Sequence, residues 1–468
     1  MRELETDYLV VGAGASGMAF VDSLVAATDA EVVLVDRRHR PGGHWLDAYP
    51  FVRLHQPSAC YGVSSRVLGD DRIDEVGPNA GSYERATAAE ICEYFHRVLE
   101  DHVASGRVRF FGMSDYRGAD AGVHHFVSLL NGEQTAVRVR RRLVDATYTE
   151  SEIPSRHTPA FEVDAGVRFV PPNDLVHLQE PATRYTVVGA GKTAMDTCSW
   201  LLDEGVDPGR IRWIRPRDGW TFNRGCFQPL TLVGSFMQLQ ACWVRAAAAA
   251  ESAGDFARRL EADGVLMRID PDVEPTVFRG STLSTGELDS LRQVEDVVRL
   301  GKVLRIGTER IELEQGSIAT DPGEVSVDCT AAGVRPTAPR PIFEPGRITL
   351  QYVTIGGVPW GAAIIGRVEA TRDDDAEKNR LCPVVVFSGN ASDLLRIART
   401  GMSGMGARAV EADLSTWDAS CRLNPAAAVT DHLDDPRVTE AFTAIGANLQ
   451  AAMSNLTERL GPTATSPV

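Results

Sequence analysis

Three glycines near the N-terminus have the spacing of a turn that binds the pyrophosphate of a dinucleotide. Gly12 allows a tight turn, Gly14 lets the backbone approach the phosphates, and Gly17 lets the following helix pack closely on the preceding strand. The N-terminus of that helix presents N–H groups and a positive dipole end to the phosphates. We therefore predict a dinucleotide site at this G-x-G-x-x-G turn, with Ala15 and Ser16 as part of it.

An acidic residue after the next apolar run limits which dinucleotide fits this turn. Asp36 directly follows residues 31–35, which read Glu-Val-Val-Leu-Val. A carboxylate at that position binds ribose hydroxyls and repels a 2′-phosphate. The pattern favours an unphosphorylated adenosine ribose, as in FAD or NAD, and Arg37 is included in the predicted site.

A second turn of the same kind begins at Gly189. Gly191 and Ala194 continue its spacing, and alanine in place of the third glycine is tolerated in this type of turn. Lys192 and Thr193 lie between them and are included in the predicted site. The sequence therefore predicts a second dinucleotide.

Arginines rather than an acid follow the second unit. Arg215 and Arg217 come just after residues 210–214, which are predicted to form a strand. A guanidinium can hold a 2′-phosphate through two parallel hydrogen bonds, which favours NADPH over NADH. The alternative is that both are ordinary exposed charges, because the chain has only three lysines and almost all its cations are arginine.

Both turns lie in the strand–turn–helix–strand pattern of a βαβ unit, which requires a parallel sheet. The units comprise residues 8–11, 18–27 and 31–35, and residues 185–188, 195–204 and 210–214. The duplication predicts an α/β fold with two Rossmann-like dinucleotide-binding domains, each a three-layer structure with a parallel sheet.

The order of these units along the chain predicts that one domain is inserted in the other. Residues 1–160 and 330–425 are expected to form the first domain, and residues 165–325 the second. An amphipathic pattern at about 435–460 predicts that residues 426–468 form a helical C-terminal tail.

The segment after Asp36 carries the residues of a family resemblance. It contains Gly42-Gly43-His44-Trp45, then Tyr49-Pro50, then Arg53-Leu54 followed by Pro57. This series resembles that of the flavin-containing monooxygenases and the Baeyer–Villiger monooxygenases. The resemblance covers most of residues 1–160, is clear at 184–217 and is thin beyond residue 333.

The resemblance implies FAD on the first turn and NADPH on the second. Gly43, His44, Trp45 and Arg53 then belong to the FAD site, with His44 expected to support the pyrophosphate loop. In these families NADPH reduces FAD and O2 adds to the reduced flavin. The resulting C4a-(hydro)peroxyflavin oxygenates a small organic substrate at nitrogen, at sulfur or at a carbonyl group, so the implied partners are a small molecule and O2.

The chain departs from these families where the chemistry is most specific. Tyr148 stands where the first link between the domains usually has glycine, and residues 161–175 lack the histidine of the F-x-G-x-x-x-H signature. His55 stands where Baeyer–Villiger enzymes tend to have an acid. The resemblance therefore carries over the cofactors but not the type of oxygenation.

His55 and Gln56 are the candidate catalytic residues, because residues 53–57 are expected to pass near the flavin ring. A histidine of near-neutral pKa can tune a peroxyflavin or relay a proton, and Gln56 can hydrogen-bond flavin or substrate. The alternative is that His55 only packs and bonds to the backbone. Trp45, Trp220 and Phe222 are candidate linings of a substrate cavity, or simply core residues.

Two other functions stay open at this point. The same cofactors could serve an oxidase or dehydrogenase that inserts no oxygen, or the chain could be a non-catalytic flavin-binding regulatory protein. A disulfide reductase is disfavoured because none of the eight cysteines forms C-x-x-C.

Composition excludes several classes of protein. The 468-residue chain is 43% hydrophobic and 24% charged, with a formal charge of −16, which argues against a nucleic-acid surface. Its start is charged without a signal-peptide core, and no apolar run approaches the ~20 residues of a membrane span. Scattered cysteines without zinc spacing indicate free thiols in a reducing cytoplasm and no metal site. The oligomeric state is left open, a homodimer being one option.

Overall fold

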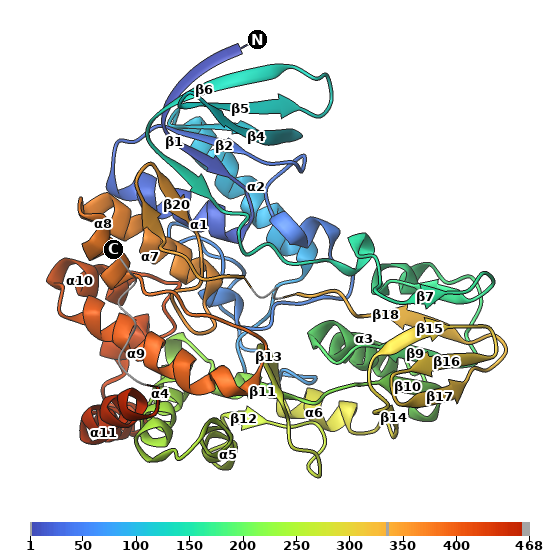
Figure 1. The fold of residues 1–468 in the computed structure, drawn as a ribbon. Helices are drawn as coiled ribbons and strands as arrows, with labels where there is room; N and C mark the ends of the chain where they lie inside the picture. The colour runs from blue at the N-terminus through green and yellow to red at the C-terminus, as the bar shows by residue number, and fades with distance from the viewer. Residues whose placement is uncertain (1, 334–336, 461–468) are drawn as a thin grey trace.

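Each glycine-rich turn follows a central strand of a parallel sheet, and the two sheets lie in separate lobes (Figure 1). The computed structural model describes residues 2–333 and 337–460. The first sheet has the order β19 (Phe343–Glu344), β20 (Arg347–Thr349), β6 (Gln134–Asp145), β1 (Arg2–Val11), β2 (Val32–Val35) and β3 (Val108–Phe111). The hairpin β4 (Ser114–Asp120) and β5 (Val123–Ser128) adds antiparallel to β6.

Helices bury the centre of the first sheet, where the end of β1 and the whole of β2 are apolar. β2 is buried along its whole length, as expected for a strand covered on both faces. The surrounding helices are α1 (Ala15–Ala27), α2 (Ala88–Ala104), α7 (Val358–Thr371) and α8 (Asp375–Leu381). α1 packs on α7, so that Phe20 and Ile364 share one core with Leu34. A capping box between Thr87 and Glu90 begins α2.

The second lobe repeats the pattern. Its parallel sheet has the order β14 (Asp296–Val298), β10 (Ile211–Ile214), β9 (Tyr185–Val188), β18 (Val325–Asp328) and β8 (Arg168–Val170). α3 (Lys192–Asp203) and α6 (Thr285–Leu291) pack together beside it. A smaller sheet, β17 (Gly316–Ala319), β16 (Arg310–Leu313), β15 (Val303–Ile306) and β7 (Glu162–Val163), completes this lobe.

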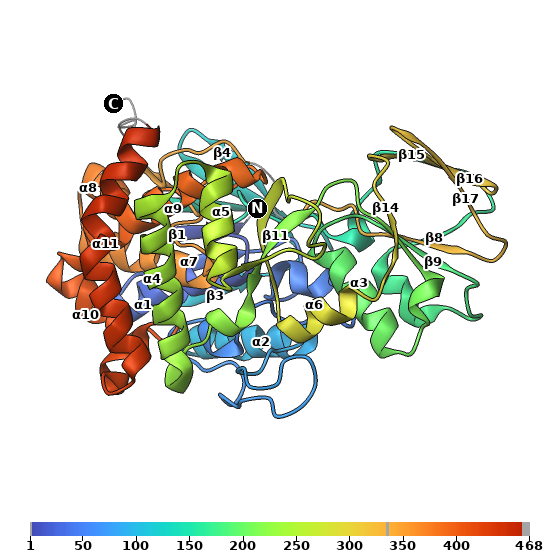
Figure 2. The same cartoon turned by 90° about the horizontal axis from the view of Figure 1, so that it is seen from below.

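A third group of elements brings the middle of the chain against its C-terminal part (Figure 2). It contains the short sheet β12 (Leu266–Met267), β11 (Gly219–Asn223) and β13 (Val277–Leu283), with helices α4 (Val233–Ala249), α5 (Ala253–Ala262), α9 (Leu394–Ala409), α10 (Ala412–Ser420) and α11 (Pro436–Leu460). Trp243, Phe256, Leu394 and Leu456 share its core.

These observations decide the fold class. The predicted α/β fold with two Rossmann-like parallel sheets and a helical C-terminus is confirmed. The domain boundaries stay a prediction, although residues 219–283 of the predicted second domain pack largely with α9 and α11. Within the described residues, no helix has both the length and the apolar character needed to span a bilayer.

Candidate functional site

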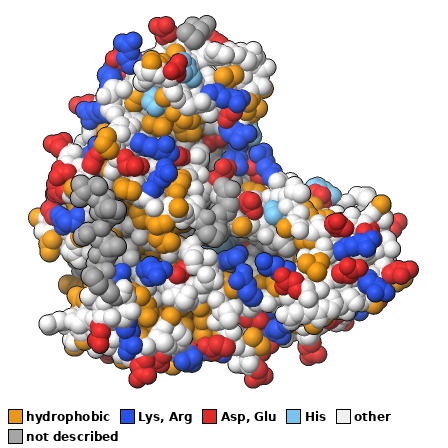
Figure 3. Space-filling view, viewed as in Figure 1, with side chains coloured by type: hydrophobic (Ala, Val, Ile, Leu, Met, Phe, Trp, Pro, Cys, Tyr) orange, Lys and Arg blue, Asp and Glu red, His pale blue; other side chains and the backbone are white. Residues whose placement is uncertain are grey.

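A single cavity of about 930 Å³ is lined by both glycine-rich turns. It runs between the lobes, and the space-filling view shows Lys and Arg side chains gathered beside the hollow there (Figure 3). The predicted site residues that line it are Gly12, Gly14, Ala15, Ser16, Asp36, Arg37, Gly43, His44, Trp45, His55, Gln56, Gly189, Gly191, Lys192, Thr193 and Arg217. Gly17, Arg53, Ala194 and Arg215 were also predicted for the site but are not among its lining residues.

The first turn has the backbone geometry that its glycines predicted. Gly12 has φ +104°, and a Cβ at Gly17 would lie 2.0 Å from the Gly12 carbonyl oxygen. Gly17 therefore serves the close helix–strand packing rather than the cavity wall. A Cβ at Gly43 would lie 2.8 Å from the Gly14 Cα, so the two loops need glycine to approach each other. α1 begins without a side-chain cap, which leaves its first N–H groups directed to the cavity.

Asp36 is held at the cavity wall by backbone donors. Its carboxylate accepts hydrogen bonds from the Ala13 N–H at 2.6 Å and the Arg38 N–H at 2.7 Å. Burial raises the pKa of Asp36, whereas these two N–H groups lower it. A carboxylate offers about four acceptor sites, so two remain for the hydroxyls of a ribose. Arg37 is largely exposed beside it, 3.5 Å from Asp115.

The second glycine-rich turn, like the first, is open to the cavity. Gly189 has φ +137°, and a Cβ there would lie 2.4 Å from the Cys329 carbonyl oxygen. A Cβ at Gly191 would meet nothing within 4 Å, so its backbone faces free space in the cavity. Ala194 is buried, which explains why the third position of this turn needs a small residue rather than a ligand-binding one.

A buried network ties the first lobe to α3. The Lys192 ammonium pairs with Asp196, which also accepts a 2.6 Å hydrogen bond from the Tyr49 hydroxyl. Phe51 stacks on Trp200 of the same helix, with 4.5 Å between ring centroids. The loop after Tyr49 is therefore docked on the second lobe, and Tyr49 and Asp196 are site residues that the sequence did not predict.

Arg215 does not have the position predicted for it. Its side chain is buried, lies 4.8 Å from the Trp213 ring centroid and pairs with Asp218 at 3.0 Å. The pKa of Arg215 is lowered, first by burial, while Asp218 raises it. Arg215 is not among the residues that line the cavity, and in the described part of the chain its Nε and Nη1 are buried without a hydrogen-bond partner.

Three other cationic side chains line the cavity near the end of β10. They are Arg217, Arg279 of β13 and Lys302 before β15. Burial and the nearby charge of Arg217 lower the pKa of Arg279, which places the two guanidiniums close together. In the described part of the chain, none of the three pairs with a carboxylate within 4.0 Å. Cations that lie together without a carboxylate partner favour the binding of an anion. The sequence did not predict Arg279 and Lys302 for the site, because neither belongs to a glycine-rich turn motif.

His55 lines the cavity as a neutral imidazole. Burial, followed by the nearby charge of the Lys192 ammonium, lowers the pKa of His55 to about 3. The near-neutral pKa expected from the sequence is therefore wrong, because the cavity wall desolvates the ring among cations. Gln56 also lines the cavity, and its amide donates to the Cys60 carbonyl at 3.2 Å.

Two buried arginines hold the backbone of this segment. Arg224 donates to the His55 carbonyl at 2.8 Å, and Arg85 donates to the Leu54 carbonyl at 3.3 Å. Both arginines pair with Glu287, at 2.7 Å and 3.0 Å. Burial alone raises the pKa of Glu287, but Lys192, Arg224 and Arg85 hold it well below its usual range. Glu287 of α6 thus fixes two consecutive carbonyls beside the cavity.

Of the other residues predicted for the FAD site, His44 and Trp45 line the cavity and Arg53 does not. Burial lowers the pKa of His44 to about 4, and the ring lies 4.8 Å from that of Trp45. The Trp45 indole donates to the Tyr61 hydroxyl at 2.7 Å. Arg53 does not line the cavity as predicted, because its exposed side chain reaches the Arg85 carbonyl at 3.1 Å.

The N-terminus of a third helix, α7, faces the same cavity. Thr354, Gly356, Val358 and Pro359 line it at the start of α7, which has no side-chain cap. The positive end of this helix favours negative charge in the cavity. The sequence did not predict this part of the site, which lies where the family resemblance is thin.

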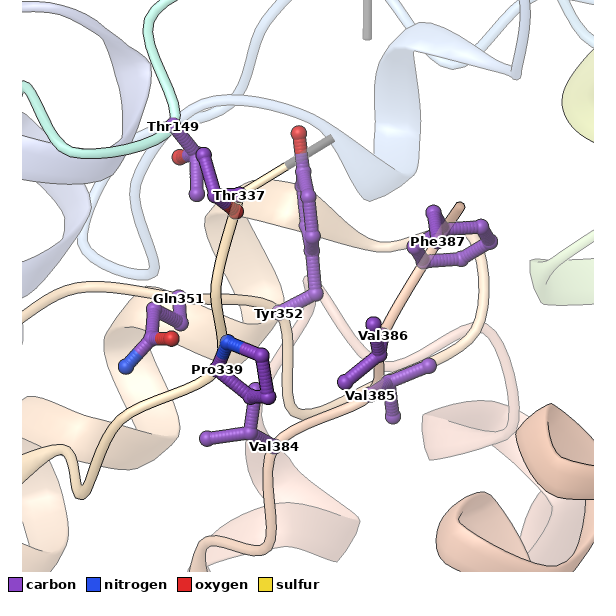
Figure 4. Close-up of a pocket in the computed structure, with 9 residues that line it drawn as sticks. All are labelled: Thr149, Thr337, Pro339, Gln351, Tyr352, Val384, Val385, Val386 and Phe387. Carbon is purple, nitrogen blue, oxygen red and sulfur yellow. The ribbon is translucent and has the colours of Figure 1, made fainter. Parts of the chain in front are cut away.

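A small pocket of about 10 Å³ adjoins the cavity (Figure 4). Thr149, Tyr352 and Phe387 line both spaces, and Val384, Val385 and Val386 line the small pocket alone. Its volume matches about one water molecule. Burial raises the pKa of the Tyr352 phenol, while a hydrogen bond with Thr149 opposes that shift.

Comparison with known sequences gives close relatives. Uncharacterized protein Rv2000 of Mycobacterium tuberculosis (strain ATCC 25618 / H37Rv) is 43% identical over 442 residues, which cover 94% of this chain and 81% of the relative. The same values hold for Uncharacterized protein Mb2023 of Mycobacterium bovis (strain ATCC BAA-935 / AF2122/97). The chain belongs to the family of these mycobacterial proteins. A sequence family described as NAD(P)-binding Rossmann-like domain matches residues 10–57, which contain the first turn and Asp36.

Comparison with solved structures shows which known folds the chain resembles. The chain resembles OTEMO in complex with FAD and NADP, with a TM-score of 0.51 and 14% identity over 78% of this chain and 82% of that one. It also resembles ε-caprolactone-bound cyclohexanone monooxygenase, with a TM-score of 0.50 and 14% identity over 87% of this chain and 98% of that one. The predicted resemblance to this group of monooxygenases is confirmed at the level of the fold.

Proposed function

We propose that this chain is a flavoprotein monooxygenase that binds FAD at the first glycine-rich turn and NADPH at the second. The observation that carries the proposal is that both turns open into one continuous cavity. Two dinucleotides bound there would meet end to end between the lobes. Hydride transfer requires such contact between the reacting rings.

The residues present fit the two cofactors. Asp36 has free acceptors for the adenosine ribose of FAD, and the uncapped N-termini of α1 and α3 face the cavity for the two pyrophosphates. Arg217, with Arg279 and Lys302 beside it, supplies cations for the 2′-phosphate of NADPH. When bound, FAD would supply acceptance of a hydride from NADPH and transfer of electrons to O2, so that one oxygen atom would enter a small organic substrate and the other would leave as water, with one proton taken up.

Several residues of the chain would position the groups that react. The docking of Tyr49 and Phe51 on α3 holds the two lobes in register. His55 is neutral, so it serves as a hydrogen-bonding group rather than as a cation that gives up its proton at neutral pH. The N-terminus of α7 supplies a positive dipole end for negative charge on the reduced flavin.

The first experiment identifies the cofactor and the products. The purified chain, reconstituted with FAD where needed, is heated to release flavin for chromatography, and NADPH oxidation is followed with O2 and a sulfide or ketone probe. FAD, together with an oxygenated product in proportion to NADPH, is expected. Hydrogen peroxide in place of any oxygenated product would favour an oxidase. FMN, or bound FAD without NADPH oxidation, would overturn the proposed enzyme.

A further inference from the structure

One part of the cavity wall consists of aromatic rings in mutual contact. Phe227 contacts Phe222 with 5.3 Å between centroids, and Phe222 contacts Phe278 at 5.4 Å. Phe278 contacts Phe387 at 6.5 Å, and Phe387 contacts Tyr352 at 5.4 Å. These five rings, here called the aromatic wall, come from the middle and the C-terminal parts of the chain.

The wall presents ring surface to the cavity rather than closing it. Phe222, Phe227, Tyr352 and Phe387 line the cavity, whereas Phe278 is 1% exposed and lies behind them. Phe227, Tyr352 and Phe387 each keep partial exposure. Because these rings line the cavity and keep partial exposure, their surface is accessible to a ligand bound there.

The wall lies beside the N-terminus of α7. A Cβ at Gly356 would lie 3.2 Å from Phe227, so this ring sits against the N-terminus of α7. Among the described residues, those that line the cavity from 219–227, from 352–359 and at 387 carry no charge. The charged lining residue at the edge of the wall is Arg279, which follows Phe278 on β13 and lies 3.2 Å from a Cβ placed at Gly389. The hydrogen-bonding groups there are few, chiefly the hydroxyls of Tyr352 and Thr354.

We propose that the aromatic wall binds the flat ring of an uncharged aromatic substrate beside Gly356, with Phe227 and Phe387 as the specificity-determining residues. The inference rests on the proposed monooxygenase and names the substrate class of that site. Edge-to-face contacts favour an aromatic ring over a saturated ring of the same size. The Tyr352 hydroxyl, near Thr149 and the small pocket, can take one hydrogen-bonding substituent (Figure 4).

The test compares two sulfides of matched size, thioanisole and cyclohexyl methyl sulfide, by calorimetric titration of the oxidised holoenzyme. Thioanisole is expected to bind about 2- to 12-fold more tightly, because aromatic contacts add about 0.5–1.5 kcal/mol beyond area burial. Equal affinities, or tighter binding of the saturated ring, would overturn the aromatic wall as a site.

Single substitutions test which rings cause the preference for thioanisole. Phe227→Leu and Phe387→Leu are expected to abolish the preference for thioanisole. Phe236→Leu is the control, because Phe236 contacts Phe227 at 5.7 Å but does not line the cavity. The same loss in Phe236→Leu would overturn the assignment to the wall. NADPH oxidation is measured in parallel, and selective binding without it would support the aromatic site while rejecting the proposed function.

Discussion

Arg215 and Asp218 form a buried ion pair, with 3.0 Å between guanidinium Nη2 and carboxylate Oδ1. Asp218 also accepts from Arg299 at 3.0 Å, so the carboxylate stands between two arginines. This arrangement turns Arg215 into the second lobe and leaves Arg217 as the strand-end cation that faces the cavity. Two arginines separated by one residue therefore have different expected roles.

Arg217→Ala is expected to raise the KM for NADPH by about one to two decades and to leave that for NADH nearly unchanged. Loss of a charge-assisted contact to the 2′-phosphate costs about 1.5–3 kcal/mol, and NADH lacks that phosphate. Steady-state kinetics with both coenzymes make the measurement.

Arg215→Ala is the matched comparison. It should lower Tm, because removing one partner of a buried pair costs about 3–5 kcal/mol and Arg299 compensates only in part. Coenzyme preference should be retained in the folded fraction. A selective loss of NADPH binding in Arg215→Ala, with none in Arg217→Ala, would reverse the two roles.

His55→Gln should shift the reduction of O2 from oxygenated product and water toward hydrogen peroxide, while FAD content and the anaerobic rate of flavin reduction stay close to those of the wild type. The reason is that the neutral ring lines the cavity and can hold one hydrogen bond to the reacting centre. Peroxide yield, flavin content and reduction rate are measured on one preparation. Unchanged peroxide yield with lower flavin occupancy would show that His55 is only structural.

Acid should destabilise the folded chain between pH 6.5 and 4. The folded pKa of His55 is about 3 and that of His44 about 4, both below the ordinary value of about 6.5. The unfolded chain therefore binds more protons in this range, and stability present above pH 6.5 is lost as the pH falls. At pH 5 each histidine should account for about 1–2 kcal/mol.

Thermal unfolding at pH 7 and pH 5 measures this effect. The fall in Tm should be smaller in His55→Gln than in the wild type, because glutamine takes up no proton. An identical fall in both proteins would show that the His55 ring is protonated in the folded chain.

Glu287→Gln should lower both Tm and flavin retention. The change leaves the Arg224 and Arg85 guanidiniums buried without their shared carboxylate, at a cost of about 3–5 kcal/mol. The carbonyls of Leu54 and His55 would then lose their fixed donors. Differential scanning calorimetry and the flavin absorbance of the same sample measure both effects.

Glu93→Gln provides a control for this experiment, since Glu93 pairs with Arg97 at an exposed site on α2. Its Tm should stay within about 1 °C of the wild type, given that exposed pairs contribute at most about 1 kcal/mol. Equal changes in the two variants would argue against a special role for the buried cluster.

Both glycine-rich turns, the acid at Asp36 and the α/β class could be predicted from the residue types and their spacing. These features are local, because a tight turn, a close helix–strand contact and a strand-end carboxylate depend on residues near each other in the chain. Gly12, Gly17 and Gly189 confirm this, since each has no room for a Cβ or adopts a left-handed φ where the motif requires glycine.

Which side chains reach the cavity, and in what charge state, depends on the packing of segments that are distant in the chain. Arg215 is turned away by Asp218, whereas Arg279 and Lys302 join Arg217 from distant strands. His55 loses its near-neutral pKa because packing between the lobes places it among buried cations. Side-chain direction, burial and long-range electrostatics depend on contacts between segments far apart in sequence, and no local spacing encodes them.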